Sequence, residues 1–102
     1  MPGSPAKIVE TGELIKSLKK LKRTLDGWQY DSVVQALARE ATSLSDHHTI
    51  LPQQDPGYPD EPETRVHPLV PGFVLIYSYL PETENTPPRI LLETVLPVQA
   101  KK

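Results

Sequence analysis

Cysteine is absent from this sequence of 102 residues. Its absence excludes disulfide bonds, thiolate zinc sites and a cysteine nucleophile. Small secreted domains usually need disulfide bonds for stability, so we expect the chain to reside in the reducing cytoplasm. No apolar run approaches the ~18 residues of a membrane-spanning helix, and the first residues lack a basic-then-apolar signal pattern. We therefore expect no contact with a membrane.

Recognisable catalytic motifs are also absent. The sequence contains no G-x-S-x-G element, P-loop, H-E-x-x-H pair or dinucleotide fingerprint. The adjacent His47 and His48 follow a predicted helix, where they would project in divergent directions, and no third ligand stands at a known spacing. We therefore predict no metal site and no cofactor. The residues alone do not decide whether the chain is an enzyme.

Charge is unevenly distributed, although the net charge is only −2. Residues 1–25 hold six basic and two acidic side chains, whereas residues 46–97 hold eight acidic and two basic ones. Such a chain could contact a polyanion with one face only. The candidate nucleic-acid contacts are the bases of the first predicted helix: Lys16, Lys19, Lys20 and Arg23. The alternative is a solvated helix face, and no aromatic residues alternate with these bases to stack on nucleotides.

The first half of the chain has the pattern of one short strand and two helices. Residues 6–10 are β-like, and Thr11 is a suitable N-cap for a helix that Asp26-Gly27 would end. Leucines recur there at spacings of four, three and four, which places them on one helical stripe: Leu14, Leu18, Leu21 and Leu25. Asp31 or Ser32 would cap a second helix. The short connection predicts an antiparallel hairpin, whose end would be closed by the aromatic residues of the turn: Trp28 and Tyr30.

The second half has the pattern of a sheet. A proline-rich loop spans 45–64, and strands are predicted at 65–70, 73–80 and 89–96. Pro68 places the first of these strands at an edge, and Pro71-Gly72 predicts a tight turn. The segment 73–80 is apolar on both faces, so we expect a central strand that is covered on both sides, or nearly so. The prediction is a single α+β domain over residues 1–102, with an N-terminal helical hairpin packed on a three- to four-stranded antiparallel sheet.

A few strand residues are suited to acid–base or phosphate chemistry. Alternate strand residues share a face, so Arg65 and His67 project together, as do Tyr77 and Tyr79. An arginine could clamp a phosphate, and His67 could act as general acid or base. The candidate catalytic set is Arg65, His67, Tyr77 and Arg89. The alternative is that the tyrosines belong to the core and that the arginines are solvated at strand ends.

The order strand, helix, helix, loop and three strands, with a basic first helix, resembles the RelE/ParE superfamily of bacterial toxins. The local likeness is the segment 65–77, RVHPLVPGFVLIY, in which a short strand, a glycine turn and an apolar strand ending in tyrosine follow one another. The resemblance implies ribosome-dependent mRNA cleavage by the candidate set, with an antitoxin protein and RNA or the ribosome as partners. Val74 and Leu75 stand where family members commonly have arginine, so an inactive relative, or one that acts on a protein target, is included in this expectation.

A non-enzymatic protein-interaction module is the alternative function. Its apolar strands and the acidic proline-rich loop would bind a partner or a second copy of the chain. We expect a homodimer to be able to form by edge pairing of the strand at 89–96, because few charges protect that edge.

Overall fold

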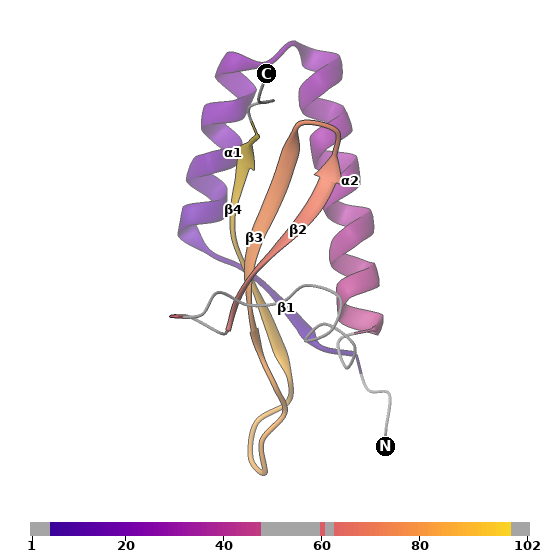
Figure 1. Cartoon of the computed structure of the whole chain (residues 1–102), viewed down its shortest axis with the longest axis vertical. Coiled ribbons are helices and arrows are strands. Elements are labelled where there is room, and N and C mark those ends of the chain that lie inside the picture. Colours follow the sequence, from indigo (N-terminus) through magenta and orange to yellow (C-terminus); the bar gives the residue numbers. More distant parts are fainter. Residues whose placement is uncertain (1–4, 48–59, 61–62, 99–102) are drawn as a thin grey trace.

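The structure is a computed structural model of the chain that describes residues 5–47, 60 and 63–98 (Figure 1). Its elements follow the order β1 (Lys7–Glu10), α1 (Gly12–Thr24), α2 (Gly27–Asp46), β2 (Thr64–Val70), β3 (Phe73–Leu80) and β4 (Arg89–Pro97). The predicted α+β class is confirmed. Of the two helices described, neither has the length and apolar character needed to cross a membrane. Most of the proline-rich loop predicted at 45–64 lies outside the described residues.

The sheet has the strand order β1-β4-β3-β2. Strands β2, β3 and β4 pair antiparallel, as predicted, and a tight turn at Pro71-Gly72 joins the first two. β1, however, pairs parallel with β4, so the sheet is mixed rather than wholly antiparallel. The N–H of Lys7 donates to Pro88 O at 2.9 Å, which aligns β1 with the start of β4. A parallel neighbour needs a long crossover connection, and the helical hairpin forms the first part of it.

Both helices pack on one face of this sheet, α1 along β4 and α2 along β2 (Figure 1). The predicted leucine stripe of α1 is confirmed, because Leu14 and Leu21 are buried and Leu18 and Leu25 pack against the same core. The N-cap is confirmed as well: Thr11 Oγ1 accepts from the N–H of Leu14 at 3.2 Å and donates to Leu92 O at 2.8 Å. One threonine thus caps α1 and ties it to β4.

The hairpin connection is shorter than predicted. The N-cap of α2 is Asp26 rather than Asp31 or Ser32, so only Leu25 and Asp26 lie between the helices. Gln29 Oε1 accepts from the N–H of Asp26 at 3.3 Å, a contact that favours an earlier helix start. Gly27 therefore has a helical backbone. Among the described residues, positive φ occurs only at Gly72, at 93°, in the turn that was predicted to need glycine.

The core lies between the helices and the alternate strand residues that face them. Its largest members include Leu14, Tyr77, Leu75, Ile90 and Leu92, all 2% exposed or less. These residues come from α1, β3 and β4, elements far apart in the sequence. Because β3 crosses the middle of the sheet, its alternate residues 75, 77 and 79 are all buried, while the residues between them are half-buried.

Candidate functional site

His67 lies in edge strand β2 and points at α2. Its side chain is only 8% exposed, and its Nε2–H donates to Glu40 Oε1 at 2.7 Å. The register that sets His67 opposite Leu75 places it on the face that the helices cover. In this position the imidazole is hydrogen-bonded to the carboxylate of Glu40, and a substrate has little access to the ring.

Arg65 and Tyr77 are cross-strand partners on the same helix-covered face. Tyr77 is fully buried and Arg65 is half-buried. Tyr79 lies on this face too: burial raises its pKa, the Arg65 guanidinium opposes that rise, and Glu82 adds to it. The structure therefore places His67 and the two tyrosines of β3 on one face of the sheet. This face lies beneath the helices and is not an exposed surface.

Arg89 lies on the opposite face of the sheet. It is in register with Leu80 of β3 and with Lys7 of β1, whereas Tyr79 of β3 pairs with the buried Ile90. The structure thus brings together three of the four candidate catalytic residues, Arg65, His67 and Tyr77, and places the fourth across the sheet from them. The four side chains do not line one common site.

The candidate nucleic-acid contacts Lys16, Lys19, Lys20 and Arg23 are all exposed on α1. Lys16 Nζ lies 3.9 Å from Glu13 Oε1, an exposed pair of little energetic weight. The structure gives these bases no common cleft in the part of the chain that it describes, and their contact with a polyanion stays a prediction.

Trp28 does not close the end of the hairpin, as the sequence had led us to expect. Its side chain is 69% exposed, because the early start of α2 turns this position outward. It borders a groove of about 360 Å³ between α2 and the β2–β3 turn, with Val33, Val70 and Phe73 among the lining residues. Sequence reasoning missed this exposure because it placed Trp28 in a loop rather than on a helix.

The face of the sheet opposite the helices carries apolar side chains that no described helix covers. It carries side chains from all four strands, and we name this set the open face: Val9, Val66, Val74, Ile76, Leu91 and Leu96. None of the six belongs to the core cluster or packs against it. Leu96 is 42% exposed, and the other five are half-buried.

A polar pair interrupts the open face near its middle. Ser78 Oγ donates a hydrogen bond to Glu93 Oε2, and Glu93 lies where the pairing of β3 with β4 shifts by one residue. Leu92 and Val95 are three residues apart and would face opposite sides of a regular strand. The extra residue at this shift turns both of them toward the core. The register shift thus places an acidic side chain, Glu93, on the open face.

Metal binding has no candidate among the described residues, since no three His, Asp or Glu side chains come together there. His47 Nδ1 contacts Ser43 O at 3.1 Å, and His48 lies outside the described part of the chain. No protein-family model matches this sequence, and no curated protein sequence is similar to it at a significant level.

Proposed function

We propose that the chain is a non-enzymatic protein-interaction module of the cytoplasm that binds a partner through the open face. One observation carries this proposal: β3 is apolar on both faces, yet the described helices cover only one of them. Apolar sheet faces are normally packed against another layer. An apolar surface that no other layer covers is typical of protein–protein contact.

The placement of the candidate catalytic residues supports the same conclusion. An acid–base site needs its groups within reach of one substrate, at about 3 Å from the reacting atoms. His67 is bound to Glu40 under α2, and Arg89 lies on the other side of the sheet. The open face, in contrast, is apolar and is covered by no described helix, which suits binding rather than acid–base chemistry.

Cross-linking in living cells tests the proposal. A photo-reactive residue at position 94, which is in register with Ile76 on the open face, should capture a protein partner or a second copy of the chain. Ile76→Glu should abolish that capture, because it places a charge in the apolar contact. Lys19→Glu, on the outer side of α1, is the matched control and should leave capture unchanged. Equal capture by both variants, or none by the parent chain, would contradict the proposal.

A toxin-like activity is the second candidate, and one observation favours it. Arg89 lies beside the open face, and its Nε, though buried, has no hydrogen-bond partner among the described residues. An arginine donor held in this way suits a phosphate or carboxylate of a target. Expression of the chain in bacteria should then arrest growth, and Arg89→Ala should relieve the arrest, while Arg39→Ala on α2 should not. Normal growth at high expression would count against this activity.

A further inference from the structure

Strand β4 is paired on both sides for only part of its length. β1 pairs with residues 89–92, so residues 93–97 have β3 on one side and no strand of the described chain on the other. The edge pairing of the strand at 89–96 that the sequence had led us to expect is therefore excluded over residues 89–92, where β1 occupies that edge. Over residues 93–97, pairing depends on which backbone groups point outward, because unpaired N–H and C=O groups are what attracts a further strand.

Two hydrogen bonds show the direction of the backbone groups at this edge. The N–H of Val98 donates to Gly72 O at 2.8 Å, toward β3. The N–H of Val95 points the other way and donates to Ser17 Oγ of α1 at 3.2 Å. Successive N–H groups of a strand alternate in direction, so position 97 is the next one whose N–H would point outward. That residue is Pro97, which has no N–H.

The hydroxyl group of Ser17 is fully used by these contacts. It donates to Leu14 O within α1 at 3.0 Å and accepts from the N–H of Val95. Serine in the middle of a helix contributes little to helix formation, because its hydroxyl competes for backbone hydrogen bonds. Here the hydroxyl serves β4 instead, since it accepts the outward hydrogen bond that a neighbouring strand would otherwise accept.

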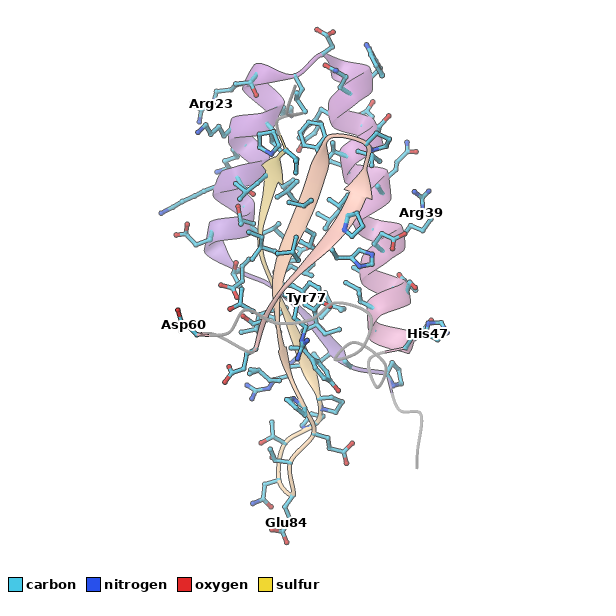
Figure 2. All side chains as sticks on the ribbon, in the orientation of Figure 1. Arg23, Arg39, His47, Asp60, Tyr77 and Glu84 are labelled. Carbon is cyan, nitrogen blue, oxygen red and sulfur yellow. The ribbon has the colours of Figure 1, made fainter. Side chains whose placement is uncertain are left out.

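Helix α1 itself also lies beside this edge (Figure 1). Between the two lies a groove of about 140 Å³, and its lining includes one basic side chain, Lys20, opposite Leu96 and Pro97. Arg23, from the last turn of the same helix, points away from the sheet (Figure 2). A covering helix, a lysine and a proline are all features that prevent strand addition at sheet edges. The end of β4 has all three, next to the exposed apolar side chain of Leu96.

We propose that α1 closes this edge of β4 to a second copy of the chain, and that Ser17 and Pro97 are the residues that remove its outward donors. Two identical strand edges would pair antiparallel about a two-fold axis, here near Val95. Such a pair needs the outward N–H groups of positions 95 and 97 from each copy. Ser17 binds the first, and Pro97 lacks the second. The contact lies at the edge of the sheet and does not involve the open face.

Sedimentation equilibrium of the full chain tests the closed edge. Ser17→Ala with Pro97→Val releases one outward donor and restores the other. This double variant should self-associate at least about tenfold more strongly than the parent chain, because each copy gains backbone hydrogen bonds. Ser32→Ala with Pro81→Val is the matched control, since Ser32 donates only within α2, to Trp28 O, and Pro81 lies beyond the end of β3. No gain in the double variant, or an equal gain in the control, would overturn the inference.

A third substitution separates this edge from the open face. Ile76→Glu, added to the double variant, should leave the gain in self-association unchanged. A gain that disappears would assign the association to the open face, which would overturn the edge inference and leave the proposed function standing.

Hydrogen exchange of the Val95 amide tests the contact without relying on the double variant. In the parent chain this amide should be protected, although no described strand pairs with it on that side. Ser17→Ala should speed its exchange by about tenfold, the effect of one lost hydrogen bond. Ser17→Thr retains a hydroxyl and should keep most of the protection. Equal exchange of Val95 in the parent chain and in Ser17→Ala would overturn the inference.

Discussion

The two faces of the sheet differ in what they contact, although both carry apolar side chains. On the helix-covered face, Leu75 and Tyr77 are fully buried and belong to one core cluster. On the open face, Val74 and Ile76 alternate with them along β3 and make no contact with that cluster. The apolar content of a strand therefore does not indicate which of its faces is packed into the core. One face is packed into the core, and no described helix covers the other.

The largest expected effect separates the two faces directly. Leu75→Ala should lower the free energy of unfolding by about 2–5 kcal/mol, because it opens a cavity in a fully buried position. Ile76→Ala, one residue away on the open face, should cost the monomer about 1 kcal/mol, because a half-buried side chain loses less packing. Urea unfolding at low protein concentration measures both values. Equal losses would show that the open face is also a folding core.

The next effect concerns the bond that holds edge strand β2 to α2. Glu40→Ala should cost about 1–3 kcal/mol, because it removes the charge-assisted acceptor of the buried His67. Gln35→Ala, at an exposed position of the same helix, should change the stability by less than about 0.5 kcal/mol. Thermal or urea unfolding compares the two. A Glu40→Ala variant as stable as the control would mean that His67 is held by its other contacts.

A smaller effect is expected where α1 joins the covered face. Thr11→Ala removes both the N-cap and the hydrogen bond to Leu92, and should cost about 1 kcal/mol. Thr11→Ser retains the hydroxyl and should recover most of that loss. Hydrogen exchange of the first turn of α1 provides a local readout, and faster exchange is expected in the alanine variant only.

The smallest expected effect is a dependence of folding stability on pH in the alkaline range. Burial raises the pKa of Tyr79 above its ordinary value near 10.0. The folded state therefore binds the phenolic proton of Tyr79 more tightly than the unfolded state does. The resulting contribution to folding stability is complete below pH 10 and is lost as pH rises through the raised pKa. Tyr79→Phe should reduce the loss of stability above pH 10. Unfolding curves at neutral and alkaline pH test this, and identical slopes for both proteins would contradict it.

Much of the fold follows from local patterns in the sequence. The leucine spacing of α1, the Thr11 cap, the glycine turn at Gly72 and the strand at 73–80 were all predicted, because each depends on neighbouring residues and helical or strand periodicity. The N-cap of α2 was predicted five or six residues late, because the bond between Gln29 and Asp26 is not evident from the apolar pattern. That error also misplaced Trp28.

The candidate site was harder to predict, since alternation tells which residues share a face but not which face a helix will cover. Periodicity correctly grouped Arg65 with His67 and Tyr77 with Tyr79. It could not show that Glu40, far away in the sequence, would meet His67, nor that Arg89 would lie on the other side. Those facts depend on strand register and on the order β1-β4-β3-β2, which are long-range properties.

Local patterns in the sequence are sufficient to predict most helices and strands, the basic α1, the acidic second half and a strand that is apolar on both faces. The parallel pairing of β1 with β4, the packing of both helices on one face, and the lack of a described element over the apolar residues of the other face are evident only from the folded structure. The physical reason is that helices and strands form from local spacing, whereas the choice of face depends on which distant surfaces exclude water together.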